Sequence, residues 1–284
     1  MVAGSARRRW SGRTSRGGSA ARHAGASTAL TVLARTGLAA RGVMYILIGA
    51  IAVQVAFGHS GRQADRAGAL HLVASTPFGE VALWLLVIGF TGMALWRLSQ
   101  AIWGTGGQDG RKAAKRLAAL ARAVFYGVVT FGILKYAIGL GAPSSSDKQS
   151  RDLTATALHY PGGQVAVVLV GLGFLGGGCY LAFRAFRKKF LRHLRMSSAS
   201  PAVQRVVTRL GQVGGIARGA VFGTAGVFLI IAGVRSSPDK AKGIDSALRA
   251  LARTPLGPWL LAAVAAGLIV FGVYSWCEAR WREV

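Results

Sequence analysis

Six apolar segments, each close to the length of a membrane span, alternate with polar connectors along this chain. A helix needs about 20 apolar residues to cross roughly 30 Å of hydrocarbon. Two segments are somewhat short, so tilt or flanking helical turns must complete them. Because the segments are nearly free of charge, the pattern predicts an all-α polytopic membrane protein with six transmembrane helices rather than a soluble bundle. The segments are residues 42–58, 79–96, 123–141, 163–183, 219–234 and 257–277.

The six segments form three similar pairs. In each pair a glycine follows the proline of the connector by 12 residues, and an aromatic residue follows it by 19. Matches at fixed offsets indicate tandem repeats. We predict repeats at 28–104, 105–190 and 191–284, after a basic tail at 1–27 that we expect to be disordered and cytoplasmic. The matching residues are Pro77, Gly89 and Trp96; Pro161, Gly173 and Tyr180; Pro255, Gly267 and Tyr274.

Each repeat crosses the membrane an even number of times, so all three enter it in the same orientation. Parallel repeats of this kind are related by an axis along the membrane normal. We therefore expect three helix pairs about a pseudo-threefold axis. The connector inside each pair carries an acid (Asp65, Asp152 or Asp245) before its Pro-x-Gly. Residues 69–74 and 247–252 are predicted to form short amphipathic helices at the interface.

The net charge of +26 is typical of nucleic-acid binding, but its distribution favours another explanation. Of the 35 Lys and Arg residues, 25 lie in residues 1–41, 97–122, 184–218 and 278–284. Basic residues are retained on the cytoplasmic side of a membrane. The pattern thus predicts a multi-pass protein of the plasma membrane with both termini cytoplasmic. We expect the lipid bilayer as its partner, with anionic lipids at the cytoplasmic face, and no nucleic acid.

The second helix of each repeat carries a stripe at seven-residue spacing that begins with the repeated glycine. Small residues let helices approach closely in lipid, and aromatic residues near a span's end sit at headgroup level. We predict that Gly89, Gly173 and Gly267 lie at helix contacts. A ligand surface lined by the aromatic residues is the alternative. Gly219 and Gly223, in the first helix of repeat 3, match the small-xxx-small contact motif.

An arginine opens the first helix of each repeat: Arg41, Arg122 and Arg218. Such residues extend toward the cytoplasmic headgroups and fix topology. Alternatively, the three form a ring of cations at the inner mouth that holds a lipid phosphate or another anion.

The position thirteen residues after each of these arginines differs among the repeats. It is occupied by Gln54, Lys135 and Ile231. An ionisable residue within a span is costly and indicates function. Lys135 and Gln54 are therefore the candidate intramembrane polar site. Lys135 also lies about six residues from the outer end of its span, where it could reach the surface as an anchor.

No catalytic, cofactor-binding or metal-ligating constellation emerges. Cys179 and Cys277 lie in predicted spans without metal-type spacing, so we interpret each as a small packing residue. Histidines occupy unrelated positions in the repeats, which argues against a haem or metal site built on the repetition. We expect a non-enzyme without cofactors. The histidines concerned are His59, His71, His159 and His193.

The repeated motifs resemble a known family. They are Ala34-Arg35-Thr36-Gly37 with Ala40-Arg41-Gly42, Ala217-Arg218-Gly219, and Thr254-Pro255 followed by Gly257. Together with three tandem helix pairs over residues 28–282, they are similar to the uncharacterised bacterial membrane family called domain-of-unknown-function 1206. The middle repeat departs from the pattern, with Ala123 in place of the glycine and Tyr160 in place of the threonine. The resemblance implies the fold and a membrane location, and no activity.

Two functions of different classes remain open. The first is a non-enzymatic membrane protein that scaffolds partners or organises lipid, because catalytic groups are lacking and the inner connectors are basic. The second is a transporter of a small solute or ion along the pseudo-threefold axis, because transporters often show such repeats. A continuous polar cavity that reaches Lys135 would favour transport, whereas a dry, packed centre would favour the first.

Overall fold

The computed structural model of the chain describes residues 14–58, 63–104, 113–194, 196, 199–252 and 257–282. Within these ranges the regular structure is helical, apart from one isolated β-bridge between Leu194 and Arg282. Six helices are long and apolar enough to cross a membrane, which confirms the predicted all-α, multi-pass class. They are α1 (Thr14–Ala56), α3 (Gly79–Trp103), α4 (Ala113–Ala137), α6 (Gly163–Phe186), α7 (Pro201–Val234) and α9 (Gly257–Trp281).

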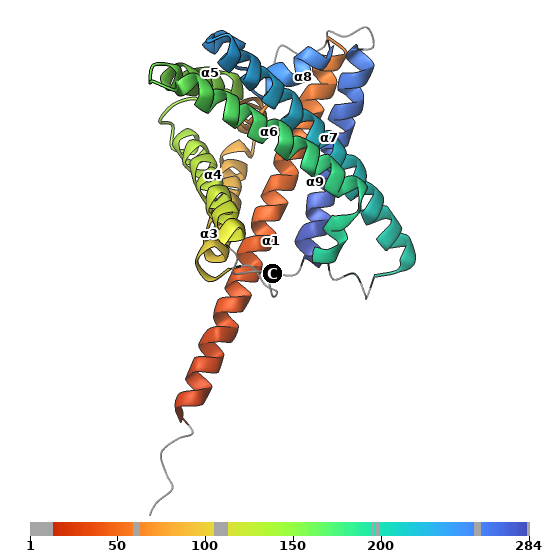
Figure 1. Cartoon of the computed structure of the whole chain (residues 1–284). Helices are drawn as coiled ribbons and strands as arrows, with labels where there is room; N and C mark the ends of the chain where they lie inside the picture. The colour runs from red at the N-terminus through yellow and green to blue at the C-terminus, as the bar shows by residue number, and fades with distance from the viewer. Residues whose placement is uncertain are drawn as a thin grey trace, which may run out of the picture.

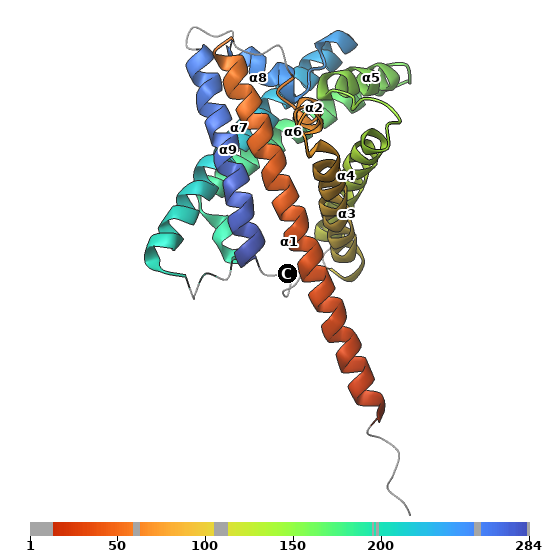
Figure 2. The same ribbon diagram turned by 180° about the vertical axis from the view of Figure 1, so that it is seen from behind.

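Shorter helices connect the long ones. Three of them, α2, α5 and α8, gather at one end of the molecule, uppermost in Figures 1 and 2, which we call the short-helix end. The opposite end, where α3, α6 and α9 finish, is called the C-terminal end (Figures 1 and 2). The shorter elements are α2 (Arg66–Ala74), α5 (Ser146–Leu158), α8 (Ile244–Ala252) and the 3₁₀ helices η1 (Lys189–His193) and η2 (Pro238–Lys240).

The N-terminal region differs from its prediction. Helix α1 begins at Thr14, so residues 14–27 are helical where we expected a disordered tail. Its alanines and arginines are good helix formers, and extending an existing helix requires no new nucleation. The rest of the predicted tail, residues 1–13, lies outside the described residues.

In the first two repeats the Pro-x-Gly motif joins the short helix to the following long helix. A Cβ at Gly79 would lie 2.6 Å from the carbonyl oxygen of Val73 in α2. A Cβ at Gly163 would overlap the corresponding carbonyl of Ala157 in α5. Only glycine therefore permits this tight turn, which explains the repeated motif in the first two repeats. Pro255 of the third repeat lies outside the described residues.

The long helices pack in the order α4, α3, α1, α9, α7 and α6. No comparable seam joins α4 to α6, although these two belong to the same repeat. The apolar core lies along α1, α3 and α9, around fully or almost fully buried side chains. Examples are Leu38, Ile51, Met93, Leu261 and Leu268.

The second repeat thus separates its two helices. Helix α6 packs on α7, and the pair runs obliquely to α1 and α9 (Figure 1). The seam is rich in glycines: a Cβ at Gly178 would lie 2.5 Å from the backbone nitrogen of Gly223 and 2.6 Å from the carbonyl oxygen of Gly219. Because one pair is open, a pseudo-threefold arrangement of the six long helices is not confirmed.

Candidate functional site

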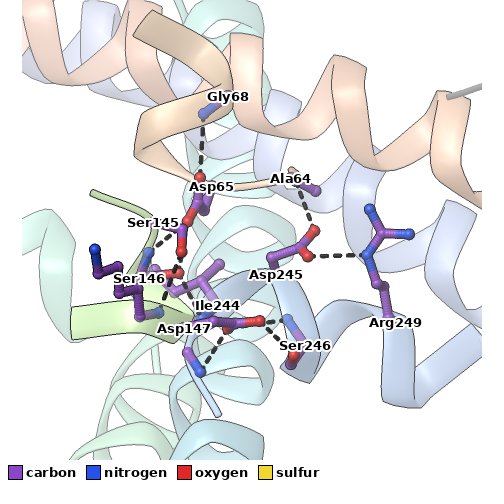
Figure 3. Close-up of polar contacts among 12 residues, drawn as sticks. Ala64, Asp65, Gly68, Ser145, Ser146, Asp147, Ile244, Asp245, Ser246 and Arg249 are labelled. Carbon is purple, nitrogen blue, oxygen red and sulfur yellow. Dashed lines mark hydrogen bonds and ion pairs between the residues drawn. The ribbon is translucent and has the colours of Figure 1, made fainter. Parts of the chain in front are cut away.

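Three aspartates hold the short helices together at the short-helix end, in what we call the aspartate hub (Figure 3). Asp65 is fully buried and caps α2, where one of its oxygens accepts from the Gly68 backbone N–H at 3.1 Å. Its other oxygen accepts from the Ser146 backbone N–H at 2.6 Å and from the Ser146 hydroxyl at 2.8 Å. The first repeat is thereby bound to the second.

Asp147 binds the second repeat to the third in the same way. Its carboxylate accepts from the Gly243 N–H at 2.7 Å and from the Ser246 N–H at 3.3 Å. The Ser246 hydroxyl also donates to it. These donors stand at the start of α8, where the backbone N–H groups of a helix lack intrahelical partners.

Asp245 closes the ring between the third repeat and the first. It accepts from the Ala64 N–H at 2.7 Å and forms an ion pair with Arg249 at 2.9 Å. Each hub aspartate therefore accepts a backbone N–H from the next repeat, in cyclic order. Within the described ranges, no three His, Cys, Asp or Glu side chains are grouped to hold a metal ion. The hub is a set of hydrogen bonds that holds the three repeats together at the short-helix end.

The hub corrects one sequence expectation. We assigned Asp152 as the second-repeat counterpart of Asp65 and Asp245, but Asp152 is exposed and Asp147 occupies that place. The Asp-to-Pro spacing varies among the repeats, so the alignment selected the wrong acid. The signal that identifies Asp147 is local, since it follows the capping residue Ser145 by two positions.

Four arginines gather near the C-terminal end in what we call the arginine cluster: Arg41, Arg97, Arg218 and Arg282. Arg41 is buried, and its Nη2 donates to Glu278 Oε2 at 2.5 Å and to Ser275 Oγ at 3.1 Å. Arg282 pairs with the other oxygen of Glu278.

Aromatic rings join the remaining arginines to the cluster. The guanidinium carbons of Arg97 and Arg282 lie 4.2 Å and 4.9 Å from the centre of the Trp96 ring. Those of Arg41 and Arg218 lie 5.2 Å and 5.1 Å from the centre of the Phe271 ring. Such cation–π contacts are favourable, but they do not neutralise charge.

The arginine cluster holds more positive than negative charge. Among the described residues, the acidic side chain of the cluster is that of Glu278. The Nε atoms of Arg97 and Arg218 are buried and have no hydrogen-bond partner in the described structure. Buried polar groups are ordinarily satisfied, so two unused donors beside an excess of charge make the cluster the candidate for the predicted anion contact.

The sequence identified part of this cluster. Of the three predicted arginines, Arg41 and Arg218 contact the same ring, while Arg122 is exposed and lies within electrostatic range of Arg218. Their role as lipid or anion contacts stays a prediction. Glu278 and Arg282 were missed, although an acid four residues before an arginine in a basic helix end is a recognisable pairing signal.

The repeated glycines behave differently in the three repeats. A Cβ at Gly89 would lie 2.5 Å from Ala40 Cβ, and a Cβ at Gly267 would overlap Ala217 Cβ, so both lie at close helix contacts. A Cβ at Gly173 would meet nothing within 4 Å, so the predicted contact is wrong there. The physical reason is that α6 packs on α7 and leaves α4, the helix that would complete the contact.

Lys135 lies at the short-helix end, two residues before α4 ends. It is exposed, and its Nζ lies 5.9 Å from the centre of the Phe131 ring. A pocket of about 250 Å³ includes Lys135 and Arg66 in its wall. Gln54 is exposed on α1 and does not line this pocket. The structure therefore does not bring the two predicted polar residues together in one site.

These features define a multi-pass, all-helical membrane protein built from three repeated helix pairs, with a hydrogen-bonded cap at one end and clustered arginines near the other. The chain belongs to the family described as Domain of Unknown Function (DUF1206), which matches residues 36–104, 117–188 and 213–282. This confirms the resemblance and the threefold repetition seen in the sequence.

One relative covers nearly the whole chain. It is the uncharacterized protein YxxB of Bacillus subtilis (strain 168), which is 30% identical over 252 residues, or 88% of this chain and 90% of the relative. No solved structure matches the chain.

Proposed function

We propose that this protein is a non-enzymatic, multi-pass protein of the plasma membrane that organises anionic lipid at its cytoplasmic face. The observation that carries the proposal is the arginine cluster, in which two of the four guanidinium groups pair with Glu278 and the other two lie against aromatic rings. An uncompensated charge near the membrane interior is costly, so an anion that completes the cluster is stabilised there. The planar guanidinium group suits phosphate oxygens especially well.

The depth of the cluster suits a lipid headgroup. Arg41 lies 15 residues, and Arg218 16 residues, before the end of its helix at the short-helix end. At a rise of about 1.5 Å per residue these positions lie roughly 22–24 Å from that end. In a hydrocarbon core of about 30 Å, the guanidinium groups come within a side chain's reach of the opposite headgroups.

The orientation follows from charge. The basic connectors and the arginine cluster lie at the C-terminal end, and basic residues are retained in the cytoplasm. Both chain termini are therefore assigned to the cytoplasm, and the short-helix end to the outer face. Cytoplasmic leaflets carry anionic lipids, which supplies the ligand that the cluster requires.

The apolar packing between Lys135 and the arginine cluster supports a lipid organiser over a transporter. Ile133, Val129 and Phe90, which lie between the level of Lys135 and that of the arginine cluster, are buried and belong to one apolar core. A transport path requires polar lining at that depth.

The test compares lipids and matched variants. In nanodiscs, replacing phosphatidylcholine with phosphatidylglycerol should raise the Tm of the wild-type protein. Arg218→Gln should lose most of this rise, because it removes a cluster guanidinium. Arg209→Gln, an exposed arginine of the same helix outside the cluster, should retain it.

An equal lipid-dependent rise in all three proteins would overturn the assignment of the cluster. A flux of ions or solutes in proteoliposomes that Lys135→Met abolishes, without loss of folding, would overturn the organiser in favour of a transporter.

A further inference from the structure

A pocket at the short-helix end remains without a role in the arginine cluster or the aspartate hub. Its volume is about 250 Å³. Its wall consists of Arg66 and neighbouring α2 residues, α4 between residues 128 and 135, the connector residues 140–144, and Ser146 and Gln149 at the start of α5. Two of these elements are fixed to one another, because the hydroxyl of Tyr136 in α4 lies 3.1 Å from Nδ1 of His71 in α2. The pocket is therefore a built part of the fold.

The charged residues in the wall of this pocket are both cations, Arg66 and Lys135. The nearest acid in sequence, Asp65, has its oxygens occupied by Gly68 and Ser146 in the hub. Arg66 lies with its guanidinium carbon 5.4 Å from the centre of the Phe125 ring, a contact that leaves its charge unneutralised.

Burial also acts on Arg66. It lowers the pKa of the guanidinium below its ordinary value, and the Asp65 carboxylate only partly opposes this effect. The direction means that the surroundings disfavour the positive charge, and a bound anion would relieve that cost.

The rest of the wall indicates what else the ligand contains. Leu70, Val129 and Ile133 contribute apolar surface to the pocket. Val128 and Phe131 also line it and are largely exposed on α4, so the pocket opens along an apolar helix face. Ser144 and Gln149 provide polar groups at its other side. A ligand that fits has a compact anionic group and an adjoining apolar part.

We infer that this pocket binds a phosphate ester, whose oxygens contact Arg66 and Lys135 and whose apolar part lies along α4. Arginine and lysine together are a common pair for phosphate recognition. The ester can come from a phospholipid headgroup at the membrane surface or from a soluble phosphate ester. The inference is separate from the proposed function, because it concerns the opposite end of the molecule and different residues.

The experiment uses the full chain in phosphatidylcholine nanodiscs, with sn-glycerol 3-phosphate as the soluble probe. Wild-type protein should bind it in a titration. Lys135→Gln and Arg66→Gln should each weaken binding about tenfold, since a charge-assisted hydrogen bond is lost. Lys148→Gln should bind like wild type, because Lys148 lines a different hollow beside Asp147 and Asp152.

A second arm tests the lipid source. With phosphatidylglycerol in the nanodisc, Lys135 should be protected from an amine-reactive reagent, as measured by mass spectrometry. Arg66→Gln should remove this protection, and Arg218→Gln should leave it intact. Protection without binding of the soluble ester assigns the pocket to a lipid headgroup. Binding of the ester without lipid protection assigns it to a soluble ligand.

The inference is overturned if the wild-type protein neither binds the ester nor shows lipid protection, or if Lys135→Gln binds as tightly as wild type. Lys135 is exposed, so its replacement leaves the packing intact and keeps the test valid even if Arg66→Gln folds poorly. Failure here leaves the lipid-dependent Tm change at Arg218 unaffected.

Discussion

At the residue scale, single glycines determine how closely the long helices approach one another. Gly89 faces Ala40 and Gly267 faces Ala217, and each alanine directly precedes the arginine that opens its repeat. The contact at Gly267 therefore fixes Arg218 beside α9, where it lies over Phe271. Gly89 belongs to α3, and Arg41 reaches the same ring through the separate contact of α1 with α9. At Gly267, packing and the arginine cluster depend on the same small residue.

We predict that Gly267→Leu lowers the free energy of unfolding by roughly 1–3 kcal/mol, because the new side chain overlaps Ala217. Gly173→Leu is the matched control in the equivalent position of the second repeat, where space is open. Thermal unfolding in detergent measures both. Equal losses of stability in the two variants would contradict the separation of α4 from α6.

The residue scale also shows where sequence reasoning stops. Arg41 was identifiable because an arginine recurs at the same place in every repeat. Its partner Glu278 lies 237 residues away and has no counterpart in the other repeats, so repetition could not reveal this pair. The spacing of Glu278 indicates only its pairing with Arg282 in the same helix. Repetition reveals what the repeats share, whereas this site depends on what one repeat has alone.

At the element scale, a helix was predictable where its own sequence carries a clear hydrophobic pattern. The six spans, together with α2 and α8, follow from apolar runs and from the amphipathic pattern before Pro-x-Gly. Helix α5 did not, because its sequence is polar and its start depends on the Ser145 cap and on bonds to α8. Packing order was also beyond the sequence, since glycines line both the packed and the open helix faces.

We predict that Asp147→Ala loosens α5 and the start of α8. The change leaves the N–H groups of Gly243 and Ser246 without their acceptor, which typically costs about 1–3 kcal/mol. Hydrogen exchange should quicken at these two residues and in α5, with little change in α1 and α9. Asp152→Ala removes an exposed acid from the same helix and should exchange like wild type. Similar exchange in both variants would contradict the conclusion that the hub holds α5 and α8 together.

For the whole molecule, the charge distribution and the two ends of the bundle lead to one topology. The aspartate hub lies at one end and the arginine cluster near the other, so most of the aspartates and most of the basic residues belong to opposite ends of the bundle. The repeats in the sequence predicted the number of membrane crossings and the parallel orientation of the three helix pairs. They could not show that one helix pair opens, because that depends on contacts between repeats.

We predict that the short-helix end faces outward. In a background with Cys179→Ala and Cys277→Ala, Ser236→Cys should react with an impermeant maleimide in intact cells. Lys188→Cys, at the other end of the bundle, should react only after lysis. Both positions are exposed. The reverse labelling pattern would invert the orientation and move the proposed lipid site to the outer leaflet.

The closing bond of the aspartate hub has a consequence for how the protein is made. The Ala64 N–H finds its acceptor in Asp245, a residue that the ribosome adds 181 positions later. Until then the first two helix pairs sit in the bilayer with an incomplete cap and a backbone donor unmet. Closure of the cap thus waits for the third helix pair, so a chain interrupted before that pair leaves the Ala64 N–H without its acceptor.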